Sequence, residues 1–259
     1  MLRDMRLAVI AFSGGVDSSL LLVAASEVIG PNLIAVTAES ETYPPAEIEL
    51  ARDFARSLGI RHRVLTTREI ANEDFSKNSP DRCYHCKKEL FSELRRIADR
   101  EGIEHILDGT NADDLADHRP GRRAAAECSV RSPLAELGFT KADVREFARE
   151  KGLAAWDKPS LACLSSRIPY GTRITPDVLR TVWRAEDVLH TAGFRQVRVR
   201  HHGDTARIEL ERADFAKILG NGVLDGITRS LKELGYTYVC LDLEGYRTGS
   251  MNESLKKSP

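Results

Sequence analysis

Six consecutive residues, Ser13-Gly14-Gly15-Val16-Asp17-Ser18, combine glycine with hydroxyl and carboxylate side chains in one short loop. Glycine lets backbone N–H groups converge on an anion, and a helix that starts there adds partial positive charge. Ser13 and Ser18 can donate hydroxyl hydrogen bonds to phosphate oxygens. Asp17 would be repelled by a bare phosphate, so its presence indicates a bridging Mg²⁺. The loop therefore predicts a magnesium-assisted phosphate site; the simpler alternative is a strand-to-helix turn that needs glycine.

The loop differs from the common phosphate-binding motifs. It lacks the Gly-Lys-Ser/Thr end of a Walker A loop, and it is not the Gly-x-Gly-x-x-Gly loop of dinucleotide-binding proteins. These two classes of nucleotide site are therefore not expected.

Cysteine forms the second chemical signal. Cys83 and Cys86 occur in Arg82-Cys83-Tyr84-His85-Cys86-Lys87, a Cys-x-x-Cys motif that precedes a predicted helix. The pair is compatible with half of a zinc site, a redox pair, or two of three ligands of an iron–sulfur cluster. Cys163 lies in a second loop, and three thiolates would leave one iron open to an external sulfide. Cys128 and Cys240 are expected to be bystanders, because unpaired cysteines are often buried apolar residues.

An arginine-rich strand supplies a third signal. Alternation places Val197 and Val199 on one face and Arg198 and Arg200 on the other. On the neighbouring strand Ala206, Ile208 and Leu210 fall with the valines, whereas Arg207 and Glu209 fall with the arginines. Arginine binds phosphate and carboxylate bidentately, so a phosphorylated, carboxylated nucleotide would suit this face. A solvated charged face is the alternative.

Strands and helices alternate in the first half of the chain. The predicted strands are 7–12, 33–37, 60–65 and 105–107, and the predicted helices are 16–28, 45–58, 87–100 and 140–151. This order predicts βαβ units in a doubly wound parallel sheet, the α/β class.

A stretch without periodicity, residues 156–172, reads as a linker or an active-site loop. After it we expect a helix over 176–190, strands over 197–200 and 206–210, a short helix over 213–219 and a strand over 238–243. The tail after Gly249 is expected to fray. The prediction is an α/β domain over residues 1–160 and a smaller α+β domain over 161–259.

Composition limits the classes of partner. The 259 residues carry 38 Lys plus Arg against 39 Asp plus Glu, so the formal net charge is −1. Proteins that hold nucleic acid through bulk charge are usually strongly basic, so such a role is not expected. The apolar run at the N-terminus is too short for a signal peptide, and no stretch approaches the roughly 18 apolar residues of a membrane span. With an odd, sparse cysteine set, this predicts a cytoplasmic protein without a membrane partner.

The glycine loop resembles the PP-loop, SGGxDS, of the N-type ATP pyrophosphatases, also called adenine nucleotide alpha hydrolase-like proteins. Gly109-Thr110-Asn111-Ala112-Asp113-Asp114 resembles a second segment of that family. The resemblance implies that the loop holds the pyrophosphate portion of ATP, and that Thr37, Thr110 and Asn111 line the nucleotide. It further implies that Asp113 or Asp114 holds Mg²⁺ together with Asp17. The alternative is that these are ordinary turn residues.

Three motifs together, namely the PP-loop, RCYxCK and the CLSSRI loop at Cys163, resemble LarE-type ATP-dependent sulfur transferases of nickel-pincer nucleotide cofactor synthesis. The resemblance covers nearly the whole chain. It implies that a carboxylate of pyridinium-3,5-biscarboxylic acid mononucleotide is adenylated and that sulfur then displaces AMP. One form of the family sacrifices a cysteine matching Cys163. The resemblance implies that the form with cysteines like Cys83 and Cys86, to which this chain corresponds, carries a [4Fe-4S] cluster. Zinc or a structural pairing is the remaining alternative.

Further site residues follow from the same resemblance. The positions that match substrate and phosphate contacts are Arg167, Arg198, Arg200, Glu186 and Glu209. Positive charge near the Cys163 thiolate, such as Arg167 or Lys158, is expected to favour the thiolate form. Surface solubility is the simplest alternative for Glu186. The family also implies a homo-oligomer, a trimer or hexamer, and an external sulfide or sulfur donor.

Other functions share the PP-loop. A tRNA thiolase uses it, often with a three-cysteine cluster, but it needs a large basic surface that the net charge of −1 does not favour. Amidotransferase-type ligases would leave the cysteines unexplained. A nucleotide-gated sensor without turnover is the third alternative, and pyrophosphate release on adding ATP and substrate would exclude it.

Overall fold

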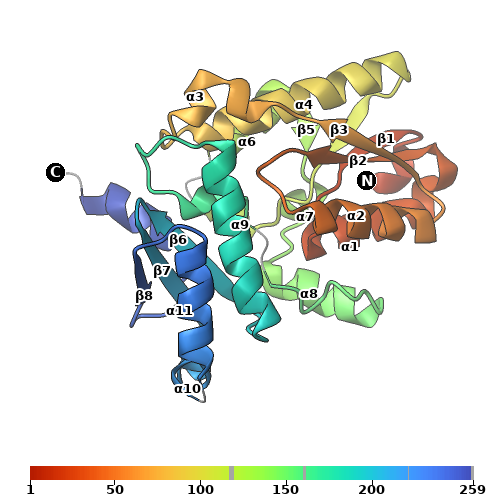
Figure 1. Cartoon of the computed structure of the whole chain (residues 1–259). Helices are drawn as coiled ribbons and strands as arrows, with labels where there is room; N and C mark the ends of the chain where they lie inside the picture. Colours follow the sequence, from red (N-terminus) through yellow and green to blue (C-terminus); the bar gives the residue numbers. More distant parts are fainter. Residues whose placement is uncertain (117–119, 160–161, 221, 258–259) are drawn as a thin grey trace. The chain divides into compact units, whose positions relative to one another are not determined.

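The computed structural model describes residues 1–116, 120–159, 162–220 and 222–257. The chain divides into two compact units, Met1–Leu161 and Ala162–Pro259, each with its own sheet and helices (Figure 1). Each unit is described by itself.

The first unit contains five parallel strands in the order β3-β2-β1-β4-β5. They are β1 (Ala8–Ala11), β2 (Leu33–Glu39), β3 (Arg61–Thr66), β4 (His105–Leu107) and β5 (Val130–Arg131). The doubly wound α/β sheet is confirmed. The strand order reverses between β1 and β4, and ligands of open α/β sheets bind beyond the carboxyl ends of strands at such a point.

Helices cover both faces of this sheet. They are α1 (Val16–Ile29), α2 (Pro45–Ser57), α3 (Glu73–Ser76), α4 (Arg82–Arg100), α5 (Asp113–Ala116), α6 (Gly121–Glu127), α7 (Pro133–Glu136) and α8 (Lys141–Glu150). Alternate residues of β1 enter opposite cores: Ile10 packs with α1, α2 and α8, whereas Val9 packs with α4 and α6. Because both faces are covered, the strand is a continuous apolar run, as the sequence indicated.

Helix α4 starts five residues earlier than predicted, at Arg82 instead of Lys87. The segment Ser79-Pro80-Asp81 precedes it, with Asp81 at the N-cap, so Cys83 and Cys86 are the second and fifth residues of the helix instead of preceding it. The residues at the start of α4 are mostly polar and show no apolar periodicity, so the sequence pattern did not indicate where this helix begins. The short strand β5 and helix α6 were also missed.

The second unit has a three-stranded sheet in the order β6-β7-β8, with β6 antiparallel and β8 parallel to β7. Its elements are α9 (Pro176–Thr191), β6 (Val197–His202), β7 (Thr205–Leu210), α10 (Phe215–Leu219), α11 (Val223–Glu233) and β8 (Tyr238–Leu241). The predicted α+β character is present, but α11 was missed. Its residues Val223, Ile227 and Leu231 do recur at helical spacing and pack in the core, but glycines at 220, 222 and 226 favour a loop reading of the segment.

Two segments predicted as irregular are short 3₁₀ helices, η4 (Leu164–Arg167) and η6 (Ser250–Lys257). Over the described residues 250–257, the expectation that the tail frays after Gly249 is wrong, because this segment forms η6. Ser250 is buried, and its hydroxyl accepts a hydrogen bond from Arg200 Nη2 at 2.8 Å.

The loop after β4 and the start of α1 approach too closely for any residue but glycine at position 109. A Cβ there would lie 2.8 Å from the Ser18 nitrogen. We predict that Gly109→Ala lowers the free energy of unfolding by about 1–3 kcal/mol, measured by urea denaturation. Gly226 is the control: it is exposed within α11 and has no atoms within 4 Å of an added Cβ. Gly226→Ala should stabilise the protein by about 0.5–1 kcal/mol, and equal effects would contradict this packing argument.

Candidate functional site

The glycine loop joins β1 to α1. Gly14 has a φ of +72°, a conformation that favours glycine, and Gly15 is the N-cap of α1. The Ser18 hydroxyl donates to the Gly15 carbonyl at 3.1 Å and accepts from the Ser13 backbone nitrogen at 3.3 Å. An added Cβ on Gly14 would lie 3.6 Å from Ala51 Cβ of α2. The loop is thus held in a tight turn at the amino end of a 14-residue helix, the geometry that favours an anion.

Asp17 connects the loop to two distant parts of the first unit. Its carboxylate accepts from Asn111 Nδ2 at 2.9 Å and from Lys141 Nζ at 2.5 Å. Sequence reasoning assigned Asp17 and Asn111 but missed Lys141. Its position depends on α8 packing against α1, which no local pattern in the sequence reveals.

The segment after β4 is held by its own carboxylates. Asp108 accepts from the Thr110 hydroxyl at 2.9 Å, and Asp114 and Asn111 exchange hydrogen bonds with each other's backbone nitrogens at 3.2 Å. Asp113 accepts from the Lys141 backbone nitrogen at 2.9 Å and so fixes the start of α8. The turn role expected as the alternative is therefore present for these residues, and magnesium binding by Asp17 and Asp113 stays a prediction.

A second lysine lies beside the loop. Lys158 Nζ contacts Glu47 Oε2 at 2.5 Å, and the Glu47 carbonyl lies 4.0 Å from a Cβ built on Gly14. Arg145 of α8 donates to the Lys158 carbonyl at 3.2 Å and anchors this segment. The ammonium groups of Lys141 and Lys158 thus form ion pairs with carboxylates next to the phosphate loop. Both are partly exposed, so a bound anion could compete for them.

Cys83 and Cys86 lie three residues apart at the start of α4, about one helical turn from each other. All five cysteines lie among the described residues and are thiols without a disulfide; Cys83 is exposed and Cys86 is half-buried. Between them Tyr84 packs under Arg123 at 3.9 Å, which ties this turn to α6. Over the described ranges, no three His, Cys, Asp or Glu side chains gather in a way that could hold a metal ion.

Cys163 belongs to the second unit and is half-buried just before η4. The Arg167 guanidinium donates to the carbonyl oxygens of Ala162 at 2.6 Å and Cys163 at 3.1 Å. It also forms a bidentate pair with Glu186 at 2.9 Å on both sides. Arg167 therefore fixes the backbone of the cysteine loop.

Glu186 is buried and its carboxylate also accepts from the Val199 backbone nitrogen at 2.9 Å. The surface alternative for this residue is wrong. Through Arg167 and Val199, Glu186 connects α9, the cysteine loop and β6.

Arg198 and Arg200 are 6% and 5% exposed, so the solvated charged face considered for them is wrong. Arg200 forms a bidentate pair with Glu209 at 2.9 and 2.7 Å and donates to the Ser166 carbonyl at 2.8 Å. Glu209 is fully buried and also accepts from Arg207 at 3.0 Å.

Arg198 differs from its neighbour because its position disfavours its own charge. Burial, followed by the nearby Arg167 cation, lowers the pKa of Arg198 to about 10, and its guanidinium lies 5.4 Å from the Tyr246 ring centre. An anion placed beside Arg198 would offset both effects.

Thr37 is buried in β2, and its hydroxyl donates to the Phe12 carbonyl at 2.8 Å and contacts His62 Nε2 at 2.8 Å. Its hydroxyl is thus engaged within the protein. The predicted nucleotide contact of Thr37 stays a prediction.

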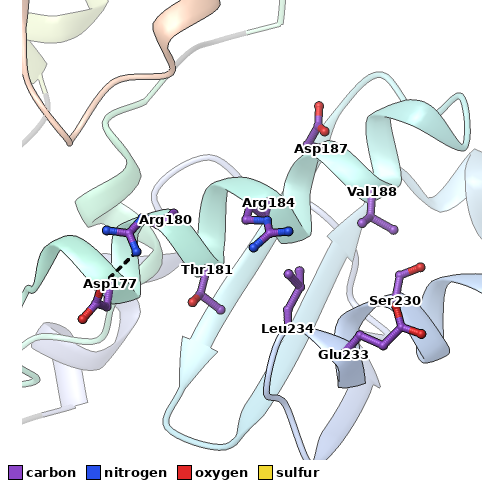
Figure 2. A pocket seen from close by; sticks show the side chains of 9 residues that line it. All are labelled: Asp177, Arg180, Thr181, Arg184, Asp187, Val188, Ser230, Glu233 and Leu234. Carbon is purple, nitrogen blue, oxygen red and sulfur yellow. Dashed lines mark ion pairs between the residues drawn. The ribbon is translucent and has the colours of Figure 1, made fainter.

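A groove of about 460 Å³ lies between α9 and α11, away from the predicted residues. It is lined by Asp177, Arg180, Thr181, Arg184, Asp187, Val188, Ser230, Glu233 and Leu234, as Figure 2 shows. The groove is lined by both acidic and basic side chains. Glu186, on the same helix α9, does not line the groove; it is buried and paired with Arg167.

Across the described residues, no helix is long and apolar enough to cross a membrane. The sheet order and the glycine loop at the carboxyl end of β1 define an α/β nucleotide-binding domain. In agreement with this class, the asparagine synthase family model matches residues 2–159.

Full-length relatives narrow the class. The chain is 42% identical over 258 residues to the pyridinium-3,5-bisthiocarboxylic acid mononucleotide synthase of Lactiplantibacillus plantarum, covering 99% of this chain and 93% of that protein. It is 44% identical to an uncharacterized protein of Synechocystis sp. over 96% and 93% of the two chains. It is 31% identical to one of Methanocaldococcus jannaschii over 93% and 90%. The chain therefore belongs to the LarE-type ATP-dependent sulfur transferases of the PP-loop superfamily.

The buried Glu209 generates a stability prediction. Glu209→Ala would leave Arg200 and Arg207 without their shared carboxylate, so the free energy of unfolding should fall by about 3–5 kcal/mol in urea. Arg180→Ala is the control within the same unit, because Arg180 pairs with Asp177 at 3.1 Å while both remain exposed. That change should cost less than about 0.5 kcal/mol. Similar losses in both variants would contradict the role assigned to Glu209.

Proposed function

We propose that this enzyme adenylates a carboxylate of pyridinium-3,5-biscarboxylic acid mononucleotide and replaces AMP with sulfur, giving a thiocarboxylate. The observation that carries the proposal is the 42% identity with the bisthiocarboxylate synthase over nearly the whole chain, together with the glycine loop at the switch point of the sheet.

In the first step the substrate carboxylate oxygen attacks the α-phosphorus of ATP. The bond from that phosphorus to the pyrophosphate oxygen breaks, giving an acyl-adenylate. The glycine loop and the amino end of α1 would hold the departing pyrophosphate, whose growing negative charge they stabilise. Asp17 and Asp113 would hold Mg²⁺, which supplies charge neutralisation on the phosphates. Carboxylate oxygens suit that ion.

The two lysines beside the loop support this step. If the Asp17 carboxylate binds Mg²⁺, Lys141 loses its carboxylate partner, and its ammonium group can donate to a phosphate oxygen. Lys158 is held by Glu47 on the other side of the loop and is available in the same way. Both ammonium groups would then act on the charge that develops during pyrophosphate release.

The second unit would bind the nucleotide substrate. Arg198 would contact the substrate phosphate, because burial and the neighbouring Arg167 lower its pKa and an anion beside it would oppose both effects. Arg200 is fixed by Glu209, and Arg167 by Glu186. The two glutamates would thus position the arginines instead of touching the substrate.

Sulfur then displaces AMP. In the sacrificial route the Cys163 thiolate attacks the acyl carbon and the bond to AMP breaks, leaving a thioester on Cys163. Loss of the Cα proton and cleavage of the Cβ–S bond would release the thiocarboxylate and leave dehydroalanine. Arg167 would hold the loop carbonyls during attack.

The other sulfur source, and the one favoured here, is a [4Fe-4S] cluster on Cys83, Cys86 and Cys163. The donor chemistry fits, because Cys83 and Cys86 are thiols in one helical turn and thiolates are the usual ligands of such clusters. The third thiol belongs to the other unit. A bound cluster with one open iron would supply sulfide as the nucleophile, and Cys163 would then survive turnover. We propose this cluster form as the main route.

The charge exchange at Asp17 can be tested on two lysines that pair with α1. Lys141→Met should lower ATP–pyrophosphate exchange about 10- to 100-fold, because an electrostatic donor to the leaving group is lost. Lys151→Met is the matched control: Lys151 pairs with Glu27 of α1 at 2.6 Å, at the end of that helix far from the loop. Its exchange rate should stay within about twofold. Equal rates in the two variants would refute the role of Lys141.

The sulfur source is settled by anaerobic purification, iron and sulfide analysis, and intact mass after turnover. The cluster route predicts bound iron, an unchanged chain mass over many turnovers, and loss of both iron and turnover in Cys83→Ala. Iron-free protein that loses about 34 Da at Cys163 after a single turnover would show the sacrificial route instead.

A further inference from the structure

Phe12, the residue that precedes the phosphate loop, is held by hydrogen bonds at its backbone nitrogen and carbonyl and by contacts of its ring. The Phe12 nitrogen donates to the Val36 carbonyl at 2.8 Å, and its carbonyl accepts from the Thr37 hydroxyl at 2.8 Å. Its ring stacks on Phe54 at 5.8 Å and meets His62 edge-on at 6.3 Å. Since Ser13 follows directly, the position of the Phe12 carbonyl sets the start of the loop.

The Thr37 hydroxyl also forms a hydrogen bond with His62. That hydroxyl has one proton and donates it to the Phe12 carbonyl, so it must accept from His62 Nε2 at 2.8 Å. Nε2 therefore carries a proton. Burial and the cationic Arg52 lower the pKa of His62, so the ring is neutral at pH 7 and has this single donor.

We propose that His62 is a positioning residue for ATP: by donating to Thr37 it orients the hydroxyl that fixes the Phe12 carbonyl and thereby the phosphate loop. His62 and Thr37 lie on neighbouring strands β3 and β2, and β2 pairs directly with β1. The chain of contacts thus crosses three adjacent strands and ends at the loop. His62 acts through Thr37 and does not touch the nucleotide.

This inference rests on the proposed binding of ATP at the glycine loop, and amide substitutions test it separately. Glutamine can place its Nε2 donor where histidine has its own, whereas the shorter asparagine cannot. We expect His62→Asn to raise the KM for ATP about five- to tenfold, with kcat and the KM for the nucleotide substrate within about twofold. His62→Gln should restore the KM for ATP to within about twofold of the wild type.

Titration calorimetry with a non-hydrolysable ATP analogue gives a readout independent of turnover. Weaker binding in His62→Asn, together with wild-type binding in His62→Gln, would support the relay. Equal affinities in wild type and His62→Asn, or equal losses in both variants, would overturn it. His105→Asn is the control, because His105 is half-buried at the start of β4, the opposite end of the sheet from the loop. Absence of binding by the wild type itself would instead refute ATP binding at the loop.

A double-variant cycle tests the route of the effect. If His62 acts through Thr37, adding His62→Asn to Thr37→Val should change the affinity for the analogue by less than twofold, since the hydroxyl is already gone. Independent, multiplying losses would show that His62 acts by another path and would overturn the relay. Thermal unfolding of each variant confirms that the comparison is made on folded protein.

Discussion

The burial of β1 between two helical layers is the constraint on which the phosphate loop depends. Alternate side chains of β1 enter cores on both faces of the sheet, so the strand can neither slide nor rotate without exposing apolar surface. Its carboxyl end therefore lies at a fixed place, next to the point where the strand order reverses. A loop of small residues can be held in a tight, anion-receptive turn there because packing fixes the strand at one end and the helix at the other.

The cationic side chains described beside the loop, Lys141 and Lys158, are both paired with carboxylates. Lys141 rests on Asp17, and Lys158 rests on Glu47. Such partly exposed pairs are weak, so exchanging a carboxylate for a phosphate costs little. In the second unit the ion pairs are buried instead of partly exposed. Arg167 with Glu186 and Arg200 with Glu209 are buried, bidentate pairs, and these hold a fixed geometry because separating either one would leave an uncompensated charge.

Local sequence patterns correctly predicted the elements whose structure is determined by neighbouring residues in the chain. The apolar run of β1, the glycine loop and the valine–arginine alternation of β6 each predicted an element that the structure contains. The alternation did not predict that the arginine face is buried, because the residues that cover it, such as Ser166 and Ser250, come from segments that read as irregular. Lys141 was missed for a similar reason: 124 positions separate it from Asp17, and only the packing of α8 on α1 brings them together. Helix α11 was missed although Val223, Ile227 and Leu231 have helical spacing, because glycines at 220, 222 and 226 favour a loop reading.

The buried arginines of the second unit differ in how their surroundings act on the charged form. Arg167 and Arg200 each form a bidentate pair with a buried glutamate. At Arg198, burial and the Arg167 cation lower the pKa to about 10, while Glu186 and Tyr246 act in the opposite direction. A phosphate bound beside Arg198 would add negative charge next to a desolvated guanidinium, where an electrostatic contact is stronger than in water. Removing Glu186 or Glu209 would disturb this balance in the wrong direction, since a guanidinium released from its glutamate would compete for the same anion and shift its position. On this view the acids of the second unit matter for selectivity through the arginines they restrain.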